Sequence, residues 1–187
     1  MWDILVKATE SNEMISIYTD ISDQEHFNAG FLEQITEEYF LMKHVTAEGI
    51  VDGHIVRRLA DVYRVDQHSQ YEQKLETLYK IQNQQHYDLL LSPVTEDENL
   101  LVEVLKTAII AERLVSIKIS DEQRESTDFI YGFVTSVTDD IVTIAKVSNY
   151  GEKDGTVTIF LRDIEAVDCD RLDEITIKLM YQHVHRR

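Results

Sequence analysis

Cysteine and proline are nearly absent from this sequence of 187 residues, which holds one of each. A single thiol, Cys169, cannot form a disulfide within the chain or supply the several thiolates of a structural zinc site. The low proline content and 43% hydrophobic residues are typical of a folded globular protein rather than a disordered chain. Because proteins without disulfides are typical of reducing compartments, we predict a cytoplasmic protein.

Long apolar runs are also lacking. The N-terminal stretch "MWDILVKATESNEM" does not start with basic residues, and Asp3 and Lys7 interrupt its apolar positions. It is too polar for a signal-peptide core or a membrane span. We therefore expect neither secretion nor insertion into a membrane.

Basic residues are scarce, with 18 Lys and Arg against 35 Asp and Glu and a formal net charge of −17. Non-specific binding to nucleic acid relies on Lys and Arg to displace counterions from phosphates. The acidic charge therefore disfavours a nucleic-acid partner without excluding one. Such a surface commonly serves solubility, with a basic partner or nucleic-acid mimicry as the alternatives.

Catalytic motifs are missing as well. The sequence has no Walker loop, no GxGxxG, no GxSxG and no HExxH. Its seven histidines do not recur at aligned positions of the repeat described next, and its aspartates lack the spacing of a calcium loop. We therefore predict no metal, no cofactor and no enzymatic activity.

The glycines form the clearest positive pattern, because all six fall into pairs separated by 102 residues. The pairs are Gly30 and Gly132, Gly49 and Gly151, and Gly53 and Gly155. The stretches "GIVDGHIVRRLADVYRVD" (49–66) and "GEKDGTVTIFLRDIEAVD" (151–168) align without a gap, and Asp52 matches Asp154. Two copies are too few for a solenoid, so we predict two similar domains, residues 1–90 and 94–187.

Each copy shows the same succession of local patterns. Helical periodicity at residues 2–9 and 101–109 precedes five short segments rich in β-branched and aromatic residues, and a second helical pattern follows. The segments predicted as strands are 14–18, 30–35, 39–45, 54–59 and 62–65 in the first copy, and 114–119, 129–137, 141–147, 156–161 and 164–167 in the second. Ser69 to Glu72 and Thr95 to Glu98 fit capping boxes, and Asp170 is expected to cap the last helix. The Asp-Gly pairs at 52–53 and 154–155 predict tight turns.

These patterns predict an α+β fold that is mainly β, with two tandem five-stranded antiparallel barrels flanked by helices. Five short strands in each copy favour a small, strongly bent barrel, because closure hides the strand edges. Gly30 and Gly132 lie within the second strand of each copy, where a barrel strand has to bend sharply.

The segments "GFLEQI" and "GFVTSV" follow the pattern G-x-[LV]-x-x-[IV]. Together with a preceding helix and five strands, this layout resembles the Sm-like fold of the Sm, LSm and Hfq RNA-binding proteins over residues 2–66 and 101–168. The Asp and Asn of that family's RNA-binding loop fall on Thr36, Phe40, Thr138 and Val142, and its Arg-Gly pair falls on Arg58-Leu59 and Phe160-Leu161. Only Arg58 matches, so the resemblance implies the fold without the uridine-binding site. PRC-barrel and other SH3-like barrels share the layout.

Basic residues gather in the first copy in "RRLADVYR", which contains Arg57, Arg58 and Arg64. With Lys43 they form our candidate site for a partner or ligand. The second copy has Ile159, Phe160 and Ala166 at the positions aligned with the three arginines. Arg57 and Arg58 face opposite sides of a regular strand, so solvated or interdomain ion pairs are the alternative interpretation.

The sequence thus favours a non-enzymatic module for protein interaction or assembly, with a protein partner or self-association. RNA binding by an Sm-like protein is the alternative, and a metal-dependent or small-molecule enzyme is a second alternative. The residues that the copies share are glycines, aspartates and aliphatics. We therefore expect any binding site where the copies differ, at "HIVRRL" and "TVTIFL".

Overall fold

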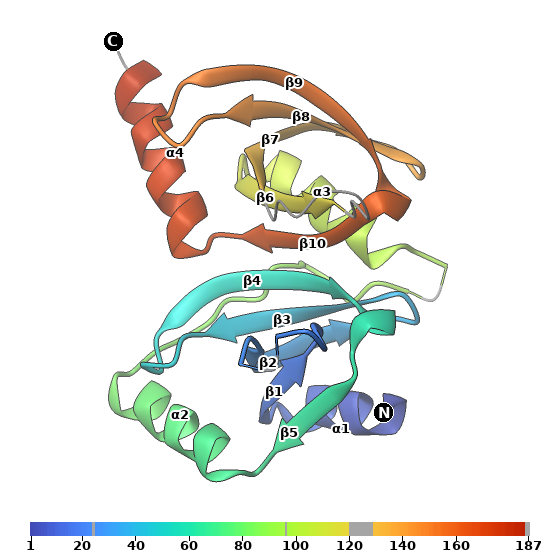
Figure 1. Cartoon of the computed structure of the whole chain (residues 1–187), viewed down its shortest axis with the longest axis vertical. Helices are drawn as coiled ribbons and strands as arrows, with labels where there is room; N and C mark the ends of the chain where they lie inside the picture. The colour runs from blue at the N-terminus through green and yellow to red at the C-terminus, as the bar shows by residue number, and fades with distance from the viewer. Residues whose placement is uncertain (24, 96, 120–128, 186–187) are drawn as a thin grey trace. The chain divides into compact units, whose positions relative to one another are not determined.

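The computed structural model describes residues 1–23, 25–95, 97–119 and 129–185. The chain divides into an N-terminal unit, Met1–Pro93, and a C-terminal unit, Val94–Arg187. Each unit consists of a helix, five strands with a short 3-10 helix between the fourth and fifth, and a second helix (Figure 1).

In the N-terminal unit the elements are α1 (Trp2–Ser11), β1 (Met14–Tyr18), β2 (Asn28–Ile35), β3 (Tyr39–Val45), β4 (Val51–Arg58), η1 (Leu59–Asp61), β5 (Arg64–Gln67) and α2 (Gln70–Ile81). In the C-terminal unit they are α3 (Leu100–Ile110), β6 (Leu114–Ile119), β7 (Ile130–Val137), β8 (Ile141–Val147), β9 (Lys153–Phe160), η2 (Leu161–Asp163), β10 (Ile164–Cys169) and α4 (Leu172–His185). The predicted strands all occur. Both 3-10 helices were missed, because Leu59 and Leu161 had been assigned to strands.

The prediction of closed barrels is wrong, although the chain is mainly β. The ten strands run in open antiparallel order, β5-β1-β2-β3-β4 in the N-terminal unit and β10-β6-β7-β8-β9 in the C-terminal unit. The first strand of each unit pairs with the last, β1 with β5 and β6 with β10, but within the described residues no pairing joins the two outer strands, β4 to β5 or β9 to β10. The strands curve, as Figure 1 shows, but they do not close.

Helices on both faces of the strands explain why closure is unnecessary. In the N-terminal unit, Leu5 and Ala8 of α1 pack on one face with Ile15, Ile17, Leu32, Phe40, Met42 and Ile55. Leu75 of α2 packs on the opposite face with Met14, Ala29, Phe31 and Val45. All five residues of β1 are buried, since both of its faces are covered. Apolar side chains that a barrel would enclose are therefore buried under helices.

Gly30 and Gly132 allow close approach of the next strand. A Cβ at Gly30 would lie 2.0 Å from the carbonyl oxygen of Lys43 on β3, and one at Gly132 would lie 2.4 Å from that of Ala145 on β8. The register shifts two residues later, between Leu32 and Gln34 on β2 and at the aligned position on β7. Both glycines thus precede a β-bulge, which bends the strand locally.

The Asp-Gly pairs occupy bulges rather than the predicted turns. The turn between β3 and β4 is closed by the Gly49 N–H, which donates to the carbonyl of Thr46, while Asp52 and Gly53 lie inside β4. Between Lys43 and Val45 the register shifts, so β4 has one extra residue there. Gly53 supplies the positive φ, 62°, that such a bulge needs. Asp154 and Gly155 take the same place in β9.

Only one of the two capping boxes starts a helix. At Ser69 both predicted hydrogen bonds are present, and α2 begins at the next residue, Gln70. The predicted start at Thr95 is wrong: α3 begins at Leu100, and the Asn99 side chain accepts hydrogen bonds from the first turn. The Glu98 carboxylate instead accepts the Thr95 N–H and hydroxyl in a local turn before the helix.

The last helix also starts later than predicted. Asp170 has a positive φ of 56° and forms an ion pair with Arg113. The carboxylate of Glu174 accepts the Arg171 N–H at 3.0 Å, one residue before α4 begins.

Candidate interaction site

The four basic residues of the predicted site come from three strands and do not share one surface. Lys43 lies on β3, Arg57 and Arg58 end β4, and Arg64 begins β5. Lys43 pairs with His54, whereas Arg57 pairs with Phe40, so Lys43 and Arg58 share one face while Arg57 lies on the other. The register therefore disperses the charges that the sequence places together.

Acidic partners also engage two of these cations. Lys43 Nζ donates to a carboxylate oxygen of Asp88 at 2.5 Å, and this contact holds the pKa of Asp88 below its ordinary range. Arg64 binds both carboxylate oxygens of Asp66, at 2.8 and 2.5 Å, and lies 4.4 Å from the ring centre of Tyr18. The pKa of Asp66 is likewise lowered, chiefly by the hydrogen bond from Arg64.

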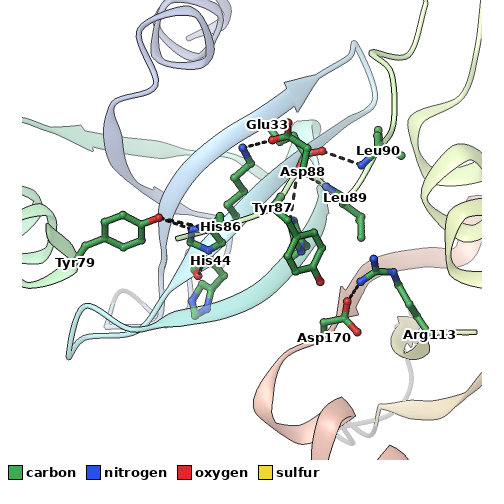
Figure 2. Close-up of polar contacts among 12 residues, drawn as sticks. Glu33, His44, Tyr79, His86, Tyr87, Asp88, Leu89, Leu90, Arg113 and Asp170 are labelled. Carbon is green, nitrogen blue, oxygen red and sulfur yellow. Dashed lines mark hydrogen bonds and ion pairs between the residues drawn. The ribbon is translucent and has the colours of Figure 1, made fainter. Parts of the chain in front are cut away.

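Lys43 and its partner Asp88 belong to a cluster of polar contacts that the sequence did not predict. This cluster holds residues 82–93, which we call the strap, to the strands of the N-terminal unit. The strap follows α2 without regular secondary structure. The carboxylate of Glu33 accepts the backbone N–H groups of Leu89 and Leu90 at 3.1 and 3.0 Å, and His54 Nε2 lies 3.0 Å from the carbonyl oxygen of Tyr87 (Figure 2). Leu89 and Leu90 are buried. The strap is therefore held by backbone hydrogen bonds and by packing.

His86 anchors the beginning of the strap. Its Nε2 lies 3.0 Å from the carbonyl oxygen of His44, which can only accept, so Nε2 carries the proton. Its Nδ1 lies 3.3 Å from the hydroxyl of Tyr79, and the two rings stack with 5.7 Å between centres. The Tyr79 hydroxyl also accepts the His86 N–H at 3.1 Å (Figure 2). Both ring nitrogens of the neutral imidazole therefore have a hydrogen-bond partner.

Burial shifts the protonation of two groups in this cluster. The pKa of His86 falls from 6.5 to about 4, because burial disfavours the charged imidazolium. The pKa of Glu33 is raised by burial, although the N–H groups of Leu90 and Leu89 act in the opposite direction. Around neutral pH the imidazole of His86 is therefore uncharged and hydrogen-bonded as described.

A cavity of about 470 Å³ lies beside the strap. Its lining comes from α1, β2, β3 and the strap, and it comprises Val6, Thr9, Glu10, Asn12, Leu32, Glu33, Gln34, Ile35, Lys43, Asp88, Leu90, Leu91, Ser92 and Pro93. The charged groups among them include Glu33, Lys43 and Asp88, which already bind the strap or one another. The cavity is thus a space beside the strap in which Glu33, Lys43 and Asp88 are already engaged by other groups of the protein.

A buried Ser–Glu hydrogen bond recurs in both units and was not anticipated. Ser16 on β1 donates to the carboxylate of Glu72 on α2 at 2.5 Å, and Ser116 on β6 is hydrogen-bonded to Glu174 on α4. Burial raises the pKa of Glu174 above its ordinary value. The signal was present in the sequence, since Ser16 and Ser116 align within "MISIY" and "LVSIK". This pair joins the second helix of each unit to its first strand.

The aspartates aligned by the repeat pair with side chains on the neighbouring strand. Asp52 lies 3.1 Å from His44 Nδ1, and Asp154 lies 2.9 Å from Lys146 Nζ. Within the described ranges, no group of three or more His, Cys, Asp and Glu side chains is arranged to hold a metal ion.

Strand β9 of the C-terminal unit is an exposed edge. It pairs with β8 on one side, and no strand lies on its other side within the described residues. Thr156, Thr158 and Phe160 are exposed, while Ile159 is buried. Arg162 lies 4.5 Å from the ring centre of Phe160. This strand contains most of "TVTIFL", one of the two stretches in which the copies differ.

No helix in the described ranges is both long and apolar enough to cross a membrane. Comparison with family models, curated proteins and solved structures finds no match to this chain.

Proposed function

We propose that this protein is a non-enzymatic, cytoplasmic module for protein interaction or assembly. In this proposal both units are open variants of the Sm-like layout that arose by duplication, and β9 is the strand to which a partner strand is added. The observation that carries the proposal is the exposed outer edge of β9.

An edge strand presents backbone N–H and C=O groups that can pair with another chain. β9 is eight residues long, and residues 156–160, "TVTIF", have no charge, no proline and no glycine. These residue types favour strand pairing. By contrast β5, the outer strand of the N-terminal unit, has four residues and carries Arg64 and Asp66. We therefore assign the contact to β9.

The RNA-binding alternative is weakened by the ion pairs of Lys43 and Arg64 and by the net charge of −17. A filter-binding titration with uridine-rich single strands at low salt should show no saturable binding, because Lys43 and Arg64 are already engaged by carboxylates and the acidic net charge opposes the approach of phosphates. Saturable binding that weakens as salt is added would favour the RNA alternative instead.

The enzyme alternative would draw on Glu33, His54 and His86, the titratable groups that lie together. Each of these side chains is hydrogen-bonded to the strap or holds it to a strand. We therefore assign them a structural role in fastening the strap.

A matched pair of variants tests the β9 edge. Thr158 on β9 lies opposite Thr143 of β8, which in turn lies opposite Ser136 of β7. Thr158 and Ser136 are both exposed and belong to one row across the sheet, but only Thr158 is on the edge strand. Lysine on an edge strand discourages strand addition. Thr158→Lys should therefore reduce the capture of partner proteins from native lysate about tenfold, a loss of about 1.4 kcal/mol.

Ser136→Lys is the control and should leave capture unchanged. Quantitative mass spectrometry of the proteins bound to each immobilised variant gives the comparison. Equal loss with both variants would place the contact on the sheet face, and equal capture by wild type and Thr158→Lys would rule out the β9 edge.

A further inference from the structure

Helix α4 has two apolar faces. Its inner face carries Glu174 and Ile177, which are buried, and Tyr181, which packs with the core of the C-terminal unit. Leu172, Ile175 and Leu179 lie on the outer face at helical spacing and are 70%, 44% and 60% exposed. We call these three residues the outer stripe. Tertiary packing within the unit accounts for the inner face only.

The N-terminal unit shows that this fold does not require an apolar outer stripe. At an offset of 102 residues, Glu72, Leu75 and Tyr79 of α2 match the inner face of α4. The positions aligned with the outer stripe are Gln70, Gln73 and Thr77, all exposed and polar. Three large aliphatic side chains exposed on one helix face are characteristic of a contact surface.

We propose that the outer stripe binds the same stripe of a second copy of this chain, with the two α4 helices antiparallel about a twofold axis near residues 175 and 176. Leu172 and Leu179 are equidistant from that point and Ile175 lies beside it, so Leu172 of each helix would lie opposite Leu179 of the other and the two Ile175 side chains would lie near the axis. A twofold contact has to be self-complementary, and this spacing meets that condition. The inference goes beyond the proposed function and does not depend on β9.

Charge along the helix favours the antiparallel arrangement. Asp173 in the first turn of α4 is exposed, whereas Glu174 belongs to the inner face and Asp168 and Asp170 are paired with Arg171 and Arg113. The second half of α4 contains Lys178, His183 and His185 and no acidic residue. An antiparallel pair brings Asp173 of each helix near the basic half of the other and places opposite ends of the two helix dipoles side by side, whereas a parallel pair places like ends together. A fourteen-residue helix is about 21 Å long, so the contact is small and should be of micromolar strength.

Substitution with the residues of α2 tests the stripe directly. Sedimentation equilibrium over about 1–500 µM should show wild type passing from monomer to dimer, the range expected for a small contact. The variant Leu172→Gln/Ile175→Gln/Leu179→Thr should stay monomeric, because it carries the polar residues that α2 tolerates at these positions. Ile81→Gln, which removes an isolated exposed isoleucine of α2, should dimerise like wild type. A monomeric wild type, or a triple variant that still dimerises, would overturn the proposal.

Disulfide trapping tests the orientation without altering the stripe. Thr176 lies near the proposed axis, so Thr176→Cys should cross-link two copies under mild oxidation. His183→Cys, seven residues along the same face, should not, because the two thiols would be about 20 Å apart in an antiparallel pair. Lys74→Cys, the aligned position in α2, is the control, and the native Cys169 is buried. Cross-linking of His183→Cys, or none of Thr176→Cys, would contradict the antiparallel dimer.

The same measurements separate this inference from the β9 proposal. Thr158→Lys should dimerise like wild type, and the triple variant should still capture the partners that need Thr158. If Thr158→Lys abolishes dimerisation and the triple variant does not, the α4 inference fails while assembly through β9 stands.

Discussion

His86 illustrates how a single side chain can fasten a segment that has no regular structure. Its ring donates to a backbone carbonyl of β3, accepts from Tyr79 of α2 and stacks on that tyrosine. This arrangement suits the neutral ring, because a proton on Nδ1 would face the hydroxyl that now donates to it. The strap should therefore be held less firmly as the pH falls.

The lowered pKa of His86 has a definite sign for stability. Between pH 6.5 and about 4 the unfolded chain binds a proton at this position and the folded chain does not, so stability is lost as the pH falls through this window. Glu33 acts oppositely, since its raised pKa costs stability as the pH rises above about 4.5. Because the contribution of Glu33 also develops above pH 4.5, the contribution of His86 is isolated by comparing the wild type with a variant at this position.

Urea unfolding should show this contribution. The loss of unfolding free energy from pH 7 to 5 should be smaller by about 1 kcal/mol in His86→Gln than in wild type, after allowance for partial solvent screening. His183→Gln removes an exposed histidine of α4 and should show the wild-type loss. An identical loss in His86→Gln and wild type would show that His86 titrates normally.

At the residue scale, sequence reasoning succeeded where partners are close in the chain. The Ser69 capping box was predictable because both of its hydrogen bonds lie within three residues. The bond between Ser16 and Glu72 joins residues 56 positions apart, and the cluster around Glu33 depends on residues brought together by folding. In the predicted basic site the strand register decides which side chains share a face, and it separates Arg57 from Lys43 and Arg58.

At the scale of elements, the strands followed from their β-branched and aromatic composition, and β1, β3, β6 and β8 have the predicted bounds. The errors lie where local patterns have two meanings. Asp-Gly suits a hairpin turn and also a bulge with positive φ, and here tertiary pairing selects the bulge in β4 and β9. Helix α3 begins at Leu100 rather than next to Thr95, because the Asn99 cap adjoins the apolar run directly.

Two glycines of the C-terminal unit should respond very differently to alanine. Gly132→Ala should lower the free energy of unfolding by more than about 3 kcal/mol, because the added Cβ would lie 2.4 Å from a backbone oxygen of β8. Gly155→Ala should lower the free energy of unfolding by about 1–2 kcal/mol, because the added Cβ would meet no atom within 4 Å and only the positive φ of 78° disfavours alanine. Thermal and urea unfolding of both variants give the values. Equal losses would mean that close packing at Gly132 is not the constraint.

At the scale of the whole molecule, composition and repeat indicated a mainly β chain, but they could not reveal whether each set of strands closes. Closure depends on whether the two outer strands of each order, β4 and β5 or β9 and β10, pair with one another, and short antiparallel strands are compatible with either outcome. The helices cover the strand faces, and open order leaves β9 as an edge. The stretch "TVTIFL", where the copies differ, therefore lies mostly at an exposed boundary of a sheet.

Amide hydrogen exchange of β9 in the presence and absence of a captured partner tests the central claim most directly. If a strand is added to β9, backbone amides of residues 153–160 that exchange freely in the isolated protein should become protected when the partner binds, because new ladder hydrogen bonds form. The amides of β7, which has a neighbour on each side, should change little. Partner binding that leaves the β9 amides unprotected would contradict the account.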